Sequence, residues 1–200
     1  MAGLGRALAM GSIPKGVHQL KGDVRINNTP AREGMDVKAG DMVITGPASS
    51  IVFVTNQDAF LVRANSRVEV MGRSGELVLT GLRIFTGALL SVFPKGERKT
   101  IYTSTAYIGI RGTGIYIESE PSRTYVCLCY GAVEISSTAD PTVRESFETE
   151  YHDQPRYVMA AGAEKIIVSA PVINHTDAEL ILLEALTGRR PPFFGGVSRY

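Results

Sequence analysis

The stretch YIGIRGTGIYIES, residues 107–119, places three glycines, Gly109, Gly112 and Gly114, within six residues. A strand pattern, in which apolar residues alternate with other residues, follows the glycines directly. Glycine in a strand marks a bulge, a bend or a close approach of two backbones. The stretch therefore predicts a bent strand at a point where neighbouring strands leave no room for a Cβ atom.

A nucleotide-binding loop is the competing interpretation of these glycines. The dinucleotide fingerprint reads G-x-G-x-x-G between a strand and a helix, whereas this stretch reads G-x-x-G-x-G and leads into a strand. Without a helix N-terminus behind it, the loop lacks the dipole that holds phosphate. No Gly-Lys-Ser/Thr sequence follows either, so the stretch is not a P-loop.

Short segments of period-two alternation, separated by turn residues, extend over most of the chain. Their spacing is typical of an all-β protein, and no helical pattern interrupts them before residue 136, which excludes a βαβ sheet. We therefore expect an all-β fold, a solenoid-like roll or a sandwich of short strands. The predicted strands cover residues 23–27, 51–55, 59–63, 67–71, 77–82, 83–93 (two strands hinged at Gly87), 114–119, 124–130, 132–136, 156–160 and 165–169.

The last third of the chain differs in character. Residues 137–155 are polar and predict a surface excursion with at most one weak strand. One amphipathic helix is expected over about 176–187, because Thr176 and Glu179 form a capping-box pattern. A leucine stripe should pack this helix on the β-domain, so that 137–200 is a C-terminal extension of the same domain. The stripe consists of Leu180, Leu183 and Leu186.

Composition and charge limit the classes of function. The chain has 200 residues, 44% of them hydrophobic, and a formal net charge of +1. Such a balanced charge argues against nucleic-acid binding, which needs a basic surface. No apolar run approaches the length of a membrane span. Residues 1–15 are interpreted as a flexible tail or the remnant of a secretion signal.

Several segments together resemble the FecR-like domain, named for the iron-dicitrate sensor. TSTAYIGIRGTGIYIESE, residues 103–120, is similar to the T-x-x-A-x-x-G-x-R-G-T segment of that family. Residues 20–54 resemble its opening strands, including G-D-x-V-x-T-G, and YGAVEI, residues 130–135, resembles its closing strand. The resemblance covers about residues 16–136, which are taken as the β-domain.

The resemblance implies a function in binding or sensing. FecR-like domains are β-rich extracytoplasmic modules of signalling proteins that act through protein contacts, and the family supplies no catalytic residues. The resemblance implies a periplasmic location, with the cytoplasm as the alternative, and a protein partner. It does not extend to the anti-sigma and membrane-spanning parts of such sensors. We therefore expect a non-enzymatic binding or sensing module.

Two cysteines in TYVCLCYG are not explained by this resemblance. In a straight strand, Tyr125, Cys127 and Cys129 share one face and Tyr130 lies on the other. The simpler interpretation is two buried thiols that pack as small hydrophobic groups. The alternatives are a redox pair, or a zinc-type site for a thiophilic metal formed with His152 and His175.

The remaining candidate residues also have simpler structural interpretations. His152 is expected to be a solvated loop histidine, with metal ligation as the alternative. His175 precedes the predicted helix, whose start explains the polar residues around it. Arg111 is interpreted as either a solvent-facing residue or an internal brace of the bend, with ligand binding together with Thr113 as the alternative. No nucleophile motif accompanies these residues, so an enzyme is not expected.

Overall fold

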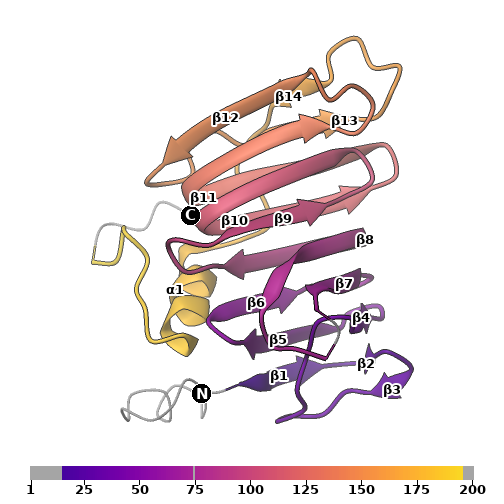
Figure 1. The fold of residues 1–200 in the computed structure, drawn as a ribbon, viewed down its shortest axis with the longest axis vertical. Coiled ribbons are helices and arrows are strands. Elements are labelled where there is room, and N and C mark those ends of the chain that lie inside the picture. The colour runs from indigo at the N-terminus through magenta and orange to yellow at the C-terminus, as the bar shows by residue number, and fades with distance from the viewer. Residues whose placement is uncertain (1–14, 74, 196–200) are drawn as a thin grey trace.

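The structure is a computed structural model that describes residues 15–73 and 75–195, so the predicted N-terminal tail lies almost entirely outside the described residues. Its strands form one continuous sheet that folds over into two layers, with a single described helix against the outside of one layer (Figure 1). This is the all-β architecture with one C-terminal helix that the sequence predicts.

The strand pairing defines the two layers. The helix-side layer contains β1 (Gly16–Lys21), β5 (Ser50–Thr55), β6 (Asp58–Val62), β13 (Arg156–Met159) and β14 (Ile167–Ser169). The opposite layer contains β3 (Thr29–Pro30), β2 (Val24–Ile26), β4 (Met42–Thr45), β7 (Arg67–Gly72), β9 (Arg98–Tyr102) and β12 (Arg144–Thr149). Three long strands run through both layers: β8 (Leu79–Val92), β10 (Ala106–Glu120) and β11 (Arg123–Ser137).

Each long strand changes partners along its length. The first part of β8 pairs with β7 and the last part with β6 and β10. Gly87 separates these parts with φ 91°, a backbone conformation that glycine adopts without strain. The sequence predicts separate strands here and in β11, but the structure shows single strands that bend. The bends let one chain segment serve both layers.

The glycine-rich stretch is the bend of β10. Its first part pairs with β9 and its last part with β8, and the register against β11 shifts between Arg111 and Ile115. A Cβ atom at Gly114 would lie 2.4 Å from the ring of Tyr130 on β11, whereas one at Gly109 would meet nothing closer than 3.9 Å. Gly114 therefore makes room for the Tyr130 ring, as the sequence predicts for this stretch.

Two apolar clusters follow from the alternation of side chains. The larger cluster fills the space between the layers and includes Phe53, Phe60, Leu82 and Ile108. The smaller cluster lies on the outer face of the helix-side layer, where the helix covers it. That outer cluster contains Val52, Val54, Ala59, Leu61, Leu90, Val92, Tyr116, Tyr125, Cys127, Cys129, Tyr130, Leu180, Leu183 and Leu186.

Helix α1 (Asp177–Leu186) confirms the predicted helix to within a residue at each end. Thr176 is its N-cap, and the Thr176 and Glu179 side chains form the predicted capping box. The leucine stripe is buried against the outer cluster, as expected. Among the described residues, no helix has the length and apolar character needed to cross a membrane.

Candidate metal centre

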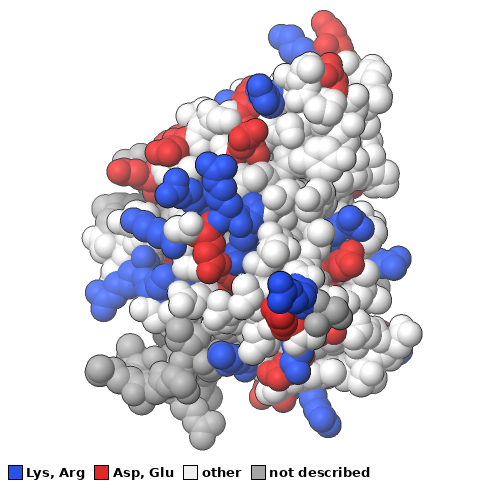
Figure 2. Space-filling model, viewed as in Figure 1, with Lys and Arg blue, Asp and Glu red and all other residues white. Residues whose placement is uncertain are grey.

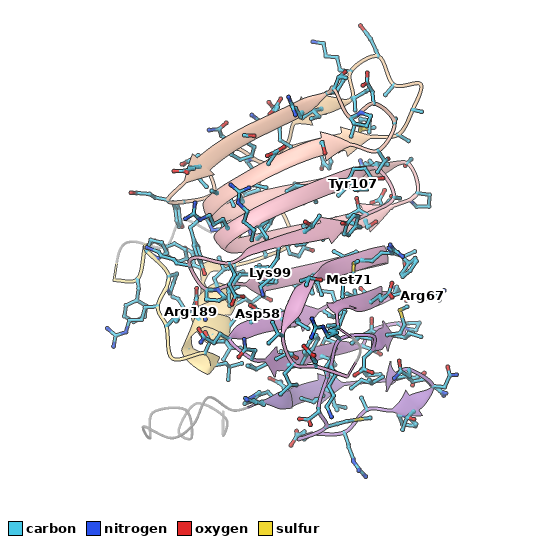
Figure 3. The ribbon with its side chains drawn as sticks, in the orientation of Figure 1. Asp58, Arg67, Met71, Lys99, Tyr107 and Arg189 are labelled. Atoms are coloured by element: carbon cyan, nitrogen blue, oxygen red, sulfur yellow. The ribbon has the colours of Figure 1, made fainter. Side chains whose placement is uncertain are left out.

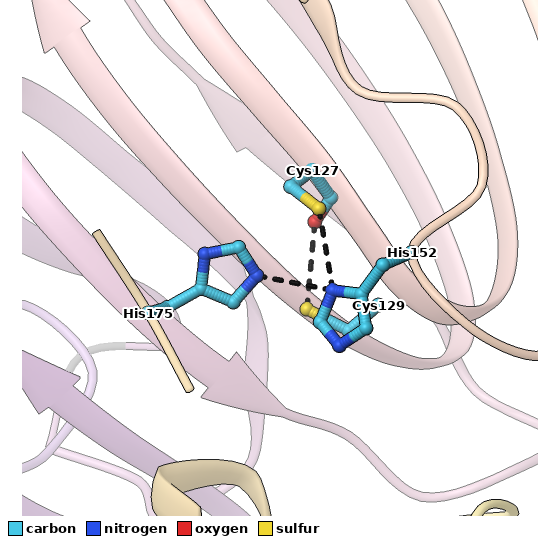
Figure 4. A group of neighbouring side chains, drawn as sticks. All are labelled: Cys127, Cys129, His152 and His175. Carbon is cyan, nitrogen blue, oxygen red and sulfur yellow. Dashed lines mark hydrogen bonds between the residues drawn. The ribbon is translucent and has the colours of Figure 1, made fainter. Parts of the chain in front are cut away.

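Four side chains with metal-ligating atoms meet beneath the C-terminal segment of the chain. Cys127 and Cys129 lie on β11, His152 in the loop between β12 and β13, and His175 directly before α1. One ligand atom from each, a sulfur or a ring nitrogen, lies within 4.8 Å of the other three, and all four residues are buried (Figure 4). The sequence indicated these four residues as a candidate set, and the structure brings them together.

A β-bulge at Cys129 brings Tyr130 to the same face of β11 as the two cysteines. Across β10 and β11, Gly114 pairs with Tyr130 and Ile115 with Leu128, so Cys129 is an extra residue on β11. Cys129 joins Cys127 in the outer cluster by simple alternation, and the extra residue lets Tyr130 join it as well. The prediction that Tyr130 lies on the opposite face from the cysteines was wrong, because a bulge interrupts the simple alternation of a strand.

His152 is held in the cluster by an uncommon backbone conformation. Its φ is 44°, in the left-handed region, and its N–H donates to the carbonyl oxygen of Cys129 at 3.1 Å. Non-glycine residues in this region cost of order 1–3 kcal/mol and concentrate at functional sites and ligand clamps. The expectation of a solvated loop histidine was wrong, since only 3% of His152 is exposed.

The ring of His175 is oriented by a hydrogen bond at Nδ1, the ring nitrogen that faces away from the cluster. Nδ1 lies 2.6 Å from the carbonyl oxygen of Ile173, an acceptor, so Nδ1 carries the hydrogen. The ring stacks on Tyr116, with centroids 4.7 Å apart and planes 20° apart. In a neutral imidazole this leaves Nε2 as the lone-pair nitrogen, and Nε2 points into the cluster.

The ring of His152 is oriented in the same way by a carboxylate. Nε2 lies 3.2 Å from Asp177 Oδ1, and the other oxygen of Asp177 accepts a hydrogen bond from the Tyr151 hydroxyl at 2.6 Å. Nδ1 then faces the interior of the cluster, 3.1 Å from His175 Nε2 and 3.5 Å from Cys127 Sγ. Metal-binding histidines typically donate their second N–H to such a carboxylate or carbonyl group.

The interatomic distances approach those of a tetrahedral site. With Zn–N bonds of about 2.0–2.1 Å and Zn–S bonds of about 2.3 Å, tetrahedral corners lie about 3.3 Å apart for two nitrogens and about 3.6 Å for nitrogen and sulfur. The observed separations of 3.1 Å and 3.5 Å are close to these values. The Cys129 thiol instead donates to the Cys127 carbonyl oxygen at 3.7 Å, and this bond would have to open for Cys129 to bind a metal.

The pKa values of the two thiols are shifted in opposite directions. The neighbouring Cys129, and then His152 and His175, lower the pKa of Cys127, although burial opposes this shift. Burial and the neighbouring Cys127 raise the pKa of Cys129. Both cysteines are free, without a disulfide. Because the thiolate is the form that binds metals, both cysteines would coordinate a metal as thiolates, and binding would release any proton that they carry.

Arg111 and Thr113 lie apart from this cluster. Thr113 is buried, accepts a hydrogen bond from the Arg111 N–H at 3.1 Å and donates to the Ala132 carbonyl oxygen at 3.2 Å, so it stabilises the bend. The Arg111 side chain is exposed and forms no ion pair among the described residues, so it is the solvent-facing residue of the two structural interpretations and not an internal brace. Arg111 lines two surface cavities, one with Lys95 and the other with Arg98. Figure 2 shows Lys and Arg side chains gathered on one face of the molecule.

Two residues of the site were not recognised as such in the sequence. Asp177 was explained by helix-start chemistry, and it both occupies the first turn of α1 and bonds His152. Phe193 lies in a C-terminal tail without periodicity, yet its ring packs 6.1 Å from that of His152. The position of Asp177 two residues after His175 could have indicated that it belongs to the site, whereas no local pattern indicated that Phe193 does.

The fold and the cluster together define a two-layer β-roll with a buried Cys₂His₂ set of side chains. No family model matches the chain, and no curated protein is similar to it. Two solved structures, at 1.65 Å and 2.50 Å resolution, are similar in fold, and each is described as a "putative anti-sigma factor" from Parabacteroides distasonis. The TM-scores are 0.51 and 0.52, each at 12% sequence identity.

The similarity is partial in both proteins. It covers 64% and 70% of this chain, and 58% and 71% of the two solved chains. At this sequence identity the likeness concerns the fold.

Proposed function

We propose that the protein is a non-enzymatic regulatory module that binds a thiophilic divalent metal of the zinc type through Cys127, Cys129, His152 and His175. One observation carries this proposal: His152 Nδ1 and His175 Nε2 face each other at 3.1 Å. The second nitrogen of each ring is bonded to an acceptor, Asp177 for His152 and the Ile173 carbonyl oxygen for His175. Two facing lone pairs repel each other unless a proton or a metal ion lies between them.

The ligand types favour a metal over two buried thiols that only pack. A set of two sulfur and two nitrogen ligands is typical of tetrahedral Zn²⁺. Simple packing explains why Cys127 and Cys129 are buried. It does not explain why two histidines, 3% and 5% exposed, turn their ring nitrogens toward them.

Three observations support a regulatory role over a catalytic one. Four protein ligands close a zinc site, whereas catalytic sites keep a position open for water or substrate. Cys127, His152 and Asp177 do follow the nucleophile, base and acid order of a hydrolytic triad, but the Cys127 side chain is fully buried. The fold is also similar to that of the two proteins described as anti-sigma factors.

Metal analysis of the purified protein tests the proposal. We expect one Zn²⁺ per chain, or one Co²⁺ after exchange with a thiolate-to-cobalt absorption band. The Cys127→Ser/Cys129→Ser variant should lose the metal and keep the β fold. His18→Gln is the control, because His18 lies on β1, outside the cluster. A folded protein with no bound metal, no uptake of added metal and two freely titrating thiols would contradict the proposal.

We further propose that the module works outside the cytoplasm and contacts a protein partner, as its resemblance to FecR-like domains implies. Fractionation of cells that produce the native protein from its own gene tests the location. The protein should be found in the periplasmic or membrane fraction. Recovery from the cytosol alone would contradict an extracytoplasmic role and would leave the metal proposal unaffected.

A further inference from the structure

The candidate metal centre is covered by the end of the chain. Residues 170–195, here called the C-terminal strap, leave β14, pass over β11, form α1 and turn back across the outer face of the helix-side layer (Figure 1). The Tyr125 hydroxyl donates to the carbonyl oxygen of Pro171 at 2.8 Å and accepts from the Ile173 N–H at 3.2 Å. These bonds attach the start of the strap to β11 beside the cysteines.

Helix α1 is attached to the layer by one apolar stripe and a few polar bonds. The stripe of Leu180, Leu183 and Leu186 packs on the outer cluster. Arg63, the residue after β6, donates hydrogen bonds to both carboxylate oxygens of Glu179 at 2.9 Å. The buried carboxylate of Glu184 accepts from the Tyr130 hydroxyl at 2.5 Å and from Arg189 at 2.6 Å. A short helix held in this way can separate locally from a stable sheet.

The candidate ligands are divided between the sheet and the strap. Cys127 and Cys129 belong to β11, whereas His175 belongs to the strap and is directly followed by Thr176, the N-cap of α1. Asp177, which orients His152, is the first residue of the helix. A metal ion bound by all four ligands would therefore join the beginning of α1 to the sheet.

Phe193 closes the opposite side of the centre. Its ring centroid lies 5.1 Å from that of Tyr151, 6.0 Å from that of Tyr130 and 6.1 Å from that of His152. With the strap in place, the sulfur atoms are fully buried. A metal ion can reach them only after part of this cover has moved.

We propose that the C-terminal strap is a lid that metal binding latches: the ion enters when the strap lifts, and coordination by His175 then holds α1 on the sheet. The proposal rests on the metal site proposed above and adds to it a conformational consequence. An apo protein would sample a strap-open state that exposes the outer apolar cluster, and the metal-loaded protein would suppress that state.

Hydrogen exchange of the whole chain, with and without Zn²⁺, tests the latch. If the ion binds only the closed strap, a free Zn²⁺ concentration 100 times the dissociation constant makes strap opening about 100-fold rarer. Amides of α1 should therefore gain about 100-fold protection. The paired residues of β7 and the first part of β8, 67–72 and 79–86, lie outside the outer cluster, so they serve as the internal control and should change far less.

The rate of metal release tests the lid. Phe193→Ala removes the ring over His152, so transfer of the metal to an excess of a chromophoric chelator should become at least severalfold faster. Phe194→Ala is the matched control, because Phe194 is the adjacent aromatic residue and is 47% exposed. Its release rate should equal that of the wild type.

The outcomes separate the two proposals. Stoichiometric metal binding with stronger protection of α1 and faster release from the Phe193 variant supports the latch. Stoichiometric binding with unchanged protection of α1, or equal release rates for both variants, overturns the latch and leaves the metal site standing. A folded protein that binds no Zn²⁺ overturns both.

Discussion

His152 and His175 are 23 positions apart in the chain, yet their ring nitrogens face each other at 3.1 Å. The second nitrogen of each ring bonds an acceptor, Asp177 in the case of His152 and the carbonyl oxygen of Ile173 in the case of His175. Three separate segments of the chain must be in place at once for these two nitrogens to meet. The arrangement is therefore a property of the folded state, and a cation between the rings would stabilise that state.

Replacing the carboxylate behind His152 should weaken metal binding. Asp177→Asn removes the charge that orients the ring and raises its basicity, and partners of this kind contribute about 10–100-fold in metal affinity. Competition with a chromophoric chelator measures the change. Glu179→Gln is the matched control, since it alters the same helical turn but contacts Arg63 and Thr176 instead of a histidine. Equal losses in both variants would indicate a general effect on α1.

Metal binding should raise thermal stability. An ion that binds only the native state at 100 times its dissociation constant contributes about 2.7 kcal/mol, which for a chain of this size corresponds to a rise in Tm of roughly 5–10 °C. Calorimetry with Zn²⁺ and then with a chelator measures this rise. The Cys127→Ser/Cys129→Ser variant should unfold at the same temperature in both conditions. A metal-dependent rise retained by this variant would point to a different site.

The three glycines of the bend should differ in their tolerance of alanine. Gly109→Ala should change the free energy of unfolding by less than about 0.5 kcal/mol, because its added Cβ meets no atom within 3.9 Å. Gly112→Ala places a side chain at φ 60° and should cost roughly 1 kcal/mol. Gly114→Ala should cost the most, roughly 1–3 kcal/mol, because the new methyl group collides with the Tyr130 ring. Urea unfolding of the three variants gives the order, and equal costs would contradict it.

Asp58 should make stability depend on pH. Asp58 and Lys99 lie side by side near Arg189 (Figure 3), with the Lys99 ammonium 3.2 Å from the carboxylate and both side chains almost fully buried. Burial raises the pKa of Asp58 to about 6, although the charge of Lys99 opposes this shift.

The direction of this dependence follows from proton uptake. Between about pH 4 and pH 6 the native state keeps a proton on Asp58 that the unfolded state has lost, so the free energy of unfolding falls as pH rises. The loss contributed by this group is roughly 3 kcal/mol by pH 7. Asp58→Asn should remove this part of the pH dependence in urea unfolding from pH 4 to pH 7, and the exposed control Asp36→Asn should keep it. A parallel profile for wild type and Asp58→Asn would exclude Asp58 as its source.

Local sequence patterns predicted the strands and the helix of this protein. Alternation of side chains along each strand, the capping pattern of Thr176 and Glu179, and the leucine stripe depend only on neighbouring residues, and each is confirmed. The steric interpretation of the β10 bend was correct for Gly114, whose missing Cβ atom leaves room for the Tyr130 ring, but not for Gly109, where a Cβ atom would fit. The pair of cysteines on one strand face was visible for the same reason.

The tertiary structure decided the rest, because it depends on contacts between distant segments. Periodicity could not show that predicted neighbouring strands are the bent parts of one strand, since pairing partners determine where a strand ends. Nor could it show the bulge at Cys129, which depends on the register between β10 and β11. The burial of His152 and its approach to His175 require β11, the loop after β12 and the C-terminal strap to pack together. The sequence alone supplied the ligand chemistry, and folding alone determined that the four side chains meet.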